Sequence, residues 1–343
     1  MYESLGQSLK TTALAAVAAS LLSVPARAES LQELADKAAN ESEIIWYESN
    51  APEMGDKIIA EFEKQFPNVK LRFERVTGAQ GAYARILQES EAKAPTADVV
   101  TTGIDQLFAL HEKKLAATPN WQDYGVPEQL SQQPYAVVTC TTTWVIIYNK
   151  EQTKAEDAPK VWDDLLDAKW KGRKLGLWAI GHAQANLVPV WGEEKVDAFV
   201  KKLTEQEPLL YKSAYTIAQN VASGELSVGI VPWHVVQGPL AAGAPLAIVH
   251  AEPVPLSMIY STVIANSPNP NGARLLVAWL SSKEGALAYE NAINRGNPYL
   301  DYTKTAEMLK GKELSVFAAA DTTRLQQLVA KYTEMLRTAG EAK

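Results

Sequence analysis

The sequence predicts an α/β protein of two lobes, each a mostly parallel sheet flanked by helices, with a ligand cleft between them. Short apolar runs typical of strands alternate with amphipathic helical segments twice along the chain. Two extended β-rich stretches separate these series, which indicates that the chain crosses from one lobe to the other and later returns. A length of 343 residues also suits two domains of about 150 residues each.

The first alternating series predicts three strands, each followed by a helix. Strands are expected at 43–48, 69–76 and 98–101, where apolar and β-branched residues gather. Apolar residues recur at helical spacing in the segments that follow, at 58–66, 83–87 and 104–110. This strand–helix order implies parallel neighbours with helices on both faces of the sheet.

The second series follows a long β-rich run. Residues 135–148 are predicted either to hold two strands or to cross between the domains. A charged, loop-like stretch with a short helix at Trp162–Leu166 comes next. Beyond it, strands are expected at 174–178, 226–231 and 260–265, and helices at 196–203, 217–221, 273–280 and 314–336. We place the crossing near 139–143 and the return near 253–260.

The beginning of the chain has the pattern of a secretion signal. Lys10 precedes an uncharged stretch, 11–24, rich in Ala, Leu and Val, and Ala26-Arg27-Ala28 supplies a small-x-small pattern. This pattern predicts cleavage before Glu29. A membrane anchor is the alternative, but the apolar stretch is shorter than the ~20 residues that a span needs. No cysteine lies at the cleavage point, so lipid attachment is not expected there.

Together these signals divide the chain into five segments. They are a signal peptide at 1–28, the first part of lobe 1 at 29–139, lobe 2 at 140–256, a return to lobe 1 at 257–300, and C-terminal helices that close the lobes at 301–343. We find no convincing internal repeat and no low-complexity tract in the mature chain.

Composition and charge exclude several classes of protein. The chain has 33 basic and 40 acidic residues and a formal net charge of −7, whereas nucleic-acid binders usually carry a basic surplus. A single cysteine, Cys140, rules out a disulfide framework and a Cys-based zinc cluster within the chain. We expect that side chain to be buried, and we expect no cofactor and no bound metal.

Polar residues follow the predicted strands where helices begin. In open parallel sheets, ligands bind at the carboxyl ends of strands, next to helix N-termini whose unpaired N–H groups favour anions. The loops at four such places supply these candidate ligand-binding residues: Ser49, Asn50, Thr77, Gly78, Thr102, Ser213 and Tyr215. The alternative is that their side chains only cap the helices.

A set of short motifs runs in order along nearly the whole mature chain. Among them are Glu61-Phe-Glu-Lys-Gln-Phe-Pro67, Arg75-Val-Thr-Gly-Ala79, Trp162-Asp163-Asp164-Leu165 and Pro268-Asn-Pro-Asn-Gly-Ala273. In this order they resemble the exported solute-binding proteins of ABC transporters, most closely the ferric-iron-type branch. The resemblance implies a type II Venus-flytrap fold whose hinged lobes close on a solute, and delivery of that solute to an ABC permease and its ATPase. It also implies a periplasmic protein, which we expect to be a monomer.

One segment departs from the ferric-iron pattern. Ferric binders of this type usually carry adjacent tyrosines after a Gly-Glu element, but here Trp233-His234-Val235 follows Gly224-Glu225. An indole cannot ligate iron, and a lone imidazole is a poor substitute for two phenolates. We therefore expect a small organic solute, and an anion is one candidate. A ferric-iron-binding protein of the same fold is the alternative.

Aromatic and imidazole side chains complete the set of candidates. Trp233 is expected to offer the ligand a flat apolar wall and His234 a hydrogen bond, the alternative being that both pack in the core of lobe 2. Trp178 and His182 bracket a loop after a predicted strand of lobe 2 and are candidates to face the cleft.

Common enzyme motifs are missing from the sequence. It contains no Gly-x-Ser-x-Gly turn, no phosphate-binding Gly-x-x-x-x-Gly-Lys loop and no His-Glu-x-x-His zinc helix. A carboxylate pair in a cleft could still cleave glycosides, so an exported cleft hydrolase is the second alternative. We expect a carrier rather than an enzyme.

Overall fold

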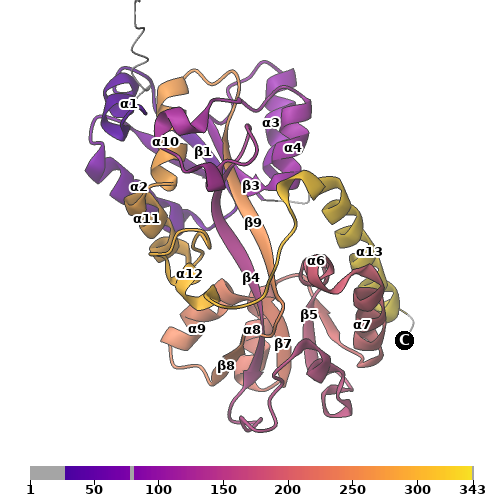
Figure 1. The fold of residues 1–343 in the computed structure, drawn as a ribbon. Helices are drawn as coiled ribbons and strands as arrows, with labels where there is room; N and C mark the ends of the chain where they lie inside the picture. Colours follow the sequence, from indigo (N-terminus) through magenta and orange to yellow (C-terminus); the bar gives the residue numbers. More distant parts are fainter. Residues whose placement is uncertain (1–27, 78–80, 342–343) are drawn as a thin grey trace, which may run out of the picture.

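The computed structural model describes residues 28–77 and 81–341 and shows two lobes joined by a pair of long strands (Figure 1). Within these residues the strands form one ten-stranded sheet. Eight strands follow the order β2-β1-β3-β9-β4-β7-β5-β6, while β10 pairs with β9 and β8 pairs with β4. The predicted two-lobed α/β architecture is confirmed.

Lobe 1 is built on three parallel strands, β1 (Ile44–Glu48), β2 (Leu71–Arg75) and β3 (Val99–Gly103). Parallel neighbours need a crossover connection, which α2 (Pro52–Gln65) and α3 (Gly81–Glu91) supply. Because Gly55 has no side chain, α2 packs directly on the Phe73 ring of β2. The other helices of this lobe are α1 (Leu31–Ala38), α4 (Ile104–Glu112), α10 (Pro270–Leu280), α11 (Lys283–Ile293) and α12 (Lys304–Leu309).

Two long strands, β4 (Val137–Asn149) and β9 (Val254–Val263), connect the lobes. They pair antiparallel from Val137 opposite Ser261 to Thr143 opposite Leu256, with an irregularity between Val138 and Cys140. The run at 135–148 is therefore a single crossing strand. Parallel pairing occurs within β1–β3 and within β5–β7. β4 and β9 run antiparallel to each other, β9 runs antiparallel to β3, and β4 runs antiparallel to β7, because the chain leaves lobe 1 and returns.

The return strand begins earlier than the sequence pattern predicts. β9 starts at Val254 rather than near residue 260, although Pro253 and Pro255 are residues typical of turns. Pro255 lies beyond the last β4 pair at Leu256, opposite Ser315 of the two-residue strand β10 (Leu314–Ser315). A proline is tolerated at such a strand end because its missing N–H is not needed by a central ladder.

Lobe 2 repeats the strand–helix alternation. β5 (Leu175–Trp178) lies between β6 (Leu209–Tyr211) and β7 (Val228–Pro232) and is parallel to both. β8 (Leu246–Val249) extends the sheet by antiparallel pairing with β4. The helices of this lobe are α5 (His182–Ala185), α6 (Val188–Trp191), α7 (Glu193–Glu205), α8 (Ala214–Ser223) and α9 (Gln237–Ala241).

The C-terminal helix α13 (Thr322–Glu341) packs on lobe 2. Its Leu328, Tyr332 and Leu336 are buried in a core cluster of that lobe, and the Tyr332 hydroxyl donates to Asp197 of α7 at 3.0 Å. α13 also contacts α4 of lobe 1, so it bridges one side of the molecule (Figure 1). The helix predicted at 314–336 begins later because residues 314–315 pair with β9 instead.

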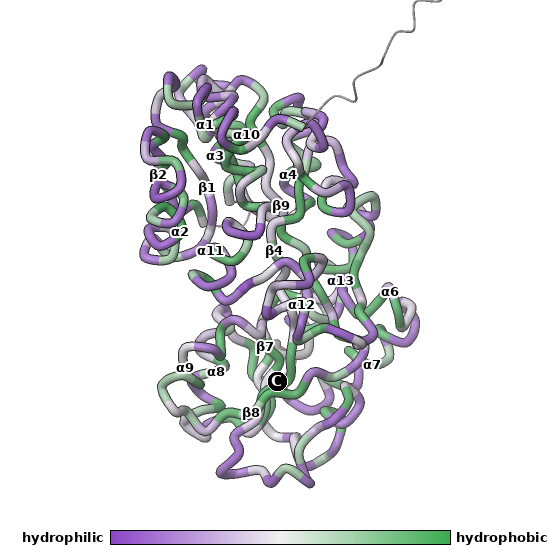
Figure 2. The backbone as a smooth tube through the Cα atoms, turned by 60° about the vertical axis from the view of Figure 1, so that its left-hand side comes forward, coloured by the Kyte–Doolittle hydropathy of each residue, from purple (hydrophilic) through white to green (hydrophobic). Residues whose placement is uncertain are grey.

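Each lobe has its own hydrophobic core. One cluster of buried residues in lobe 1 includes Trp46, Phe62 and Trp279, and two clusters in lobe 2 include Trp162 and Ile147. The outer loops of both lobes are largely hydrophilic (Figure 2). Cys140 is buried and forms no disulfide within the part of the chain that the structure describes, as predicted.

Some predictions fall outside the described residues. The signal peptide and its cleavage pattern concern residues 1–28, of which only the last is described, and the candidate Gly78 also lies outside. Across residues 28–77 and 81–341, every helix is too short or too polar to cross a bilayer.

Candidate functional site

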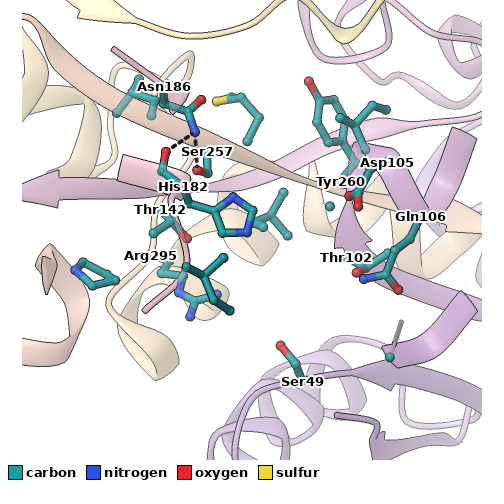
Figure 3. A pocket seen from close by; sticks show the side chains of 18 of the residues that line it. Ser49, Thr102, Asp105, Gln106, Thr142, His182, Asn186, Ser257, Tyr260 and Arg295 are labelled. Carbon is teal, nitrogen blue, oxygen red and sulfur yellow. Dashed lines mark hydrogen bonds between the residues drawn. The ribbon is translucent and has the colours of Figure 1, made fainter. Parts of the chain in front are cut away.

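A cavity of about 610 Å³ opens between the two lobes. The carboxyl ends of β1 and β3 contribute residues from lobe 1, those of β5 and β7 contribute from lobe 2, and the crossing strands contribute Thr142 and Ser257. Side chains from both lobes converge on this space (Figure 3). Its volume lies in the range of small-molecule sites, about 300–1,000 Å³.

Most residues predicted from the sequence meet in this cavity. Its lining includes eight of the candidates: Ser49, Thr77, Thr102, Trp178, His182, Ser213, Tyr215 and His234. Asn50 and Trp233 do not belong to the lining, and Gly78 lies outside the described residues. The geometry of parallel strands explains the gathering, since the parallel strands of each lobe end on the same side.

Helix capping does not account for the hydroxyl residues at the strand ends. Ser213 directly precedes α8, yet its side chain makes no capping hydrogen bond. The residues that precede α2 and α4 are Ala51 and Gly103, so Ser49 and Thr102 do not occupy the capping positions. These three residues therefore line the cavity, and their hydroxyls do not cap the helices that follow.

Three flat rings form a ladder on the lobe 2 wall. Trp144 stacks on Trp178 with centroids 5.5 Å apart, and Trp178 stacks on His182 at 5.6 Å. The indole N–H groups anchor this ladder: Trp144 Nε1 donates to Ser257 Oγ at 3.3 Å, and Trp178 Nε1 donates to the carbonyl of Lys212 at 3.3 Å. The cavity thus has a rigid aromatic wall.

Trp233 does not supply that wall. Its ring packs against the core cluster of lobe 2 that contains Val231 and Val235. Trp233 and His234 are consecutive residues of a 3₁₀ turn, Trp233–Val236, in which neighbouring side chains point about 120° apart. Only one of the two can face the cavity, and it is His234.

Arg295 brings a positive charge to the cavity from the loop after α11. Its Nη2 lies 2.8 Å from Nε2 of His234, so the contact joins lobe 1 to lobe 2. A guanidinium only donates, which makes Nε2 the acceptor and leaves the imidazole proton on Nδ1. Burial, together with the charge of Arg295, holds the pKa of His234 well below its usual value. The ring is therefore neutral.

Glu48, the last residue of β1, lines the same cavity with only 2% of its surface exposed. Asn50 Nδ2 donates to its Oε1, so Asn50 orients this carboxyl rather than lining the cavity itself. Oε2 is buried and has no hydrogen-bond partner in the described part of the chain. Burial raises the pKa of Glu48 to about 7, and the positive charge of Arg295 offsets part of this rise. The carboxyl is close to its titration midpoint at neutral pH.

A polar bridge ties the lobe 2 wall to the crossing strands. Asn186 Nδ2 donates to the carbonyl of His182 at 2.9 Å and to Ser257 Oγ at 3.0 Å (Figure 3). Burial lowers the pKa of His182, while the negative charge of Asp105, on the lobe 1 wall, acts in the opposite direction. The two walls therefore influence each other electrostatically across the cavity.

Several important lining residues have no counterpart among the predicted candidates: Glu48, Asp105, Asn186, Ser257 and Arg295. Glu48 is the one that a sequence signal could have revealed, because a carboxylate directly after the apolar run at 44–47 ends a buried strand. Arg295 and Ser257 come from the return to lobe 1, far along the chain from the other lining loops, and no local pattern marks them.

The arrangement suits an anion with an apolar body. One guanidinium, several hydroxyls and a ring ladder face the same space, and guanidinium groups form strong charge-assisted hydrogen bonds to carboxylates and phosphates. No group of three or more His, Cys, Asp or Glu side chains in residues 28–77 and 81–341 is arranged to hold a metal ion.

Comparison with known proteins agrees with this architecture. Residues 49–287 match the family model for bacterial extracellular solute-binding proteins. A Haemophilus influenzae protein described as uncharacterized is 30% identical over 136 residues, which is 38% of this chain. That match spans only 39% of the relative's own length.

Solved structures share the fold along most of the chain. Iron-bound HitA from Pseudomonas aeruginosa has a TM-score of 0.69 and 18% identity, over 85% of this chain and 99% of that one. AfuA from Actinobacillus pleuropneumoniae, with fructose 6-phosphate bound, has a TM-score of 0.64 and 22% identity, over 86% of this chain and 98% of that one. The substrate-binding protein of an ABC transporter from Agrobacterium tumefaciens has a TM-score of 0.68 and 18% identity, over 87% of this chain and 95% of that one.

These structural likenesses are all below 25% identity and establish the fold rather than the solute. The family model covers more than half of the sequence, and the neighbours include periplasmic and ferric-iron-binding proteins. The cleft lies between two lobes, as in a type II periplasmic binding protein. The chain therefore belongs to the bacterial extracellular solute-binding protein family.

Proposed function

We propose that this chain is the solute-capturing component of an ABC importer and that it binds a small organic anion in the cleft between its lobes. Residues of both lobes line a cavity of suitable size. The paired strands β4 and β9 provide the hinge. Closure around a solute is then stabilised by contacts that both lobes make to the same molecule.

The position of Arg295 carries this proposal. Its guanidinium lines the cavity, Nη2 engages His234 of the opposite lobe, and Nε has no hydrogen-bond partner among the described residues. An anion bound by the remaining N–H groups would be held at the junction of the two lobes. The ladder of Trp144, Trp178 and His182 offers an apolar surface for the rest of the solute.

Ferric iron is the alternative solute, because HitA carries iron on the same fold. Three features of this cavity favour the organic anion. The positive charge of Arg295 repels a ferric ion, Nε2 of His234 is already engaged by Arg295, and Trp233 packs in the core. A hydrolase with a serine nucleophile at Ser257 is disfavoured as well, since Ser257 Oγ accepts from Asn186 and Trp144 and is not bonded to a general base.

We further propose that the chain works as a periplasmic monomer after cleavage before Glu29. It would hand its solute, chemically unchanged, to a membrane permease with an attached ATPase, and so act as a carrier rather than an enzyme. The leader pattern supports export, and the structural likeness to an ABC-transporter binding protein supports this partner. Lobe 1 would comprise 29–139 and 257–300, and lobe 2 would comprise 140–256.

Calorimetric titration of the mature chain tests the proposal. The panel comprises benzoate, 4-aminobutyrate, fructose 6-phosphate and Fe(III). We expect at least one organic anion to bind, and we expect Arg295→Gln to weaken that binding by about tenfold or more, since hydrogen bonds to charged groups contribute about 1.5–3 kcal/mol.

Arg274→Gln is the matched control. Arg274 is also half-buried, but its guanidinium lies 5.8 Å from the Tyr124 ring, outside the cavity lining. The affinity of Arg274→Gln for the same anion should stay within about twofold of the wild type, because the charge that it removes lies outside the cavity lining. Binding of Fe(III) alone, or full organic-anion affinity in Arg295→Gln, would contradict the proposal.

A further inference from the structure

We propose that anion capture in the cleft is coupled to proton uptake by Glu48. This inference rests on the proposed function, because it requires an anion to bind beside Arg295. Glu48 then serves as a buried proton acceptor that responds to the charge of the solute. The protein would take up one anion together with a fraction of a proton, so its affinity would depend on pH.

The geometry around Glu48 supports this role. The carboxyl is 2% exposed and lines the cavity, Asn50 Nδ2 donates to its Oε1, and hydrogen bonding with Tyr289 offsets only part of the cost of burial. Within the described chain Glu48 forms no salt bridge, so the positive charge of Arg295 acts on it from beyond ion-pair distance. A carboxyl that is buried with so few donors is easily driven to its neutral form.

The charge of Arg295 links the solute to Glu48. In the empty cleft, that charge favours the ionised form of Glu48. An anion bound to Arg295 cancels this effect and adds a like charge nearby, and both changes favour protonation. If the bound charge lies about 6 Å from the carboxyl and the effective dielectric constant is about 20, one added negative charge raises the pKa of the carboxyl by about 2 units.

The other titratable groups that face Glu48 do not compete for the proton. They are Arg295 beyond α11, Tyr289 on α11 and Cys140 on β4. Burial raises the pKa of Tyr289 well above its usual value and the pKa of Cys140 to about 12, and the imidazole of His234 stays neutral. Of these described groups, Glu48 is the one whose pKa, about 7, lies in the working range of pH.

NMR titration of the wild-type mature chain with ¹³C-labelled glutamate tests the coupling. The probes are benzoate and dimethyl phosphate, which both keep a single negative charge between about pH 5.5 and about pH 8.5. Binding beside Arg295 is followed by its Nε–Hε resonance, and protonation of Glu48 by its Cδ resonance. We expect a saturating probe to raise the Glu48 midpoint by about 1–2 pH units.

The coupling also predicts a pH-dependent affinity. With a midpoint near 7 in the empty cleft and about 9 in the complex, the Kd of the bound probe should rise about tenfold from about pH 6 to about pH 8. In Glu48→Gln, which imitates the neutral acid, the Kd should stay constant within about twofold over that range. The NMR measurement uses the wild-type chain, so it decides whether anion binding and protonation of Glu48 are coupled even if Glu48→Gln folds poorly.

The outcomes separate the two proposals. Movement of both the Arg295 resonance and the Glu48 midpoint supports the coupling. Movement of the Arg295 resonance with an unchanged Glu48 midpoint overturns the coupling and leaves anion binding intact. If neither probe moves the Arg295 resonance, anion binding beside Arg295 fails and the coupling fails with it.

Discussion

Replacing Glu48 with glutamine should stabilise the solute-free protein at neutral and alkaline pH. The wild-type carboxyl is 2% exposed, and its Oε2 lacks a hydrogen-bond partner among the described residues. Ionisation of this group is therefore unfavourable in the folded state but unhindered in the unfolded chain. Glutamine has nearly the same shape and carries no charge, so it removes this penalty.

The magnitude follows from the raised pKa of Glu48, about 7 in the folded protein against 4.5 for the free group. Below about pH 4 both states hold the proton, and the residue has no effect. As the pH rises from about 4.5 to about 7, the unfolded chain releases its proton while the folded protein retains it, so the free energy of unfolding falls. Above the folded pKa the full penalty applies, about 3 kcal/mol at 1.36 kcal/mol per pH unit.

Urea denaturation at about pH 4, 6 and 8 measures this effect. The variant should gain up to about 3 kcal/mol of unfolding free energy at pH 8 and differ little from the wild type at pH 4. Glu290→Gln is the matched control: Glu290 is also 2% exposed, but its oxygens accept from Lys304 N, Thr305 N and Thr305 Oγ1 at 2.7–2.9 Å.

In Glu290→Gln, the amide NH₂ group would face N–H and O–H donors instead of accepting from them. We therefore expect the free energy of unfolding to fall by about 1–3 kcal/mol at pH 8. Opposite signs for the two glutamates would show that donor supply, rather than burial alone, decides whether a buried carboxylate is tolerated. Our reasoning is refuted if Glu48→Gln is less stable than the wild type at pH 8, or if its difference from the wild type does not change with pH.

Two further changes test the cleft and the C-terminal helix. Trp178→Ala removes the middle ring of the ladder and should weaken benzoate binding about tenfold in calorimetry, since aromatic contacts add about 0.5–1.5 kcal/mol beyond area burial. Gly181→Ala should lower the Tm by several degrees in calorimetric scans. The new Cβ of residue 181 would lie 2.8 Å from the backbone nitrogen of Thr333 in α13. Backbone atoms of a packed helix cannot move aside as the end of a flexible side chain can.

Each of these two changes has a control in the same lobe. Trp233→Ala should leave benzoate affinity within about twofold, because its ring packs in the core and lies outside the cavity lining. Gly238→Ala meets nothing within 4 Å and should be neutral or slightly stabilising in α9. Equal affinity losses in both tryptophan variants would mean that the ladder is not the solute-binding wall.

The alternation of strands and helices was predictable because it follows from local periodicity. A helix or strand that buries one face must repeat apolar residues at the period of its own backbone, so the expected strand at 43–48 appears as Ile44–Glu48. Ser49, Thr102 and Ser213 were predictable for a related reason. In parallel sheets the loops after the strands share one edge whatever the details of packing.

The sequence by itself thus determined the order of elements, the two-lobed class and the loops that face the cleft. Only the tertiary structure decided that His234 rather than Trp233 faces it, and that Arg295 reaches His234 and acts on Glu48. The physical reason is the separation along the chain over which each effect acts. Periodicity and turn chemistry act between neighbours in the chain, whereas the meeting of an arginine, an imidazole and a carboxyl from three distant segments depends on how those segments pack.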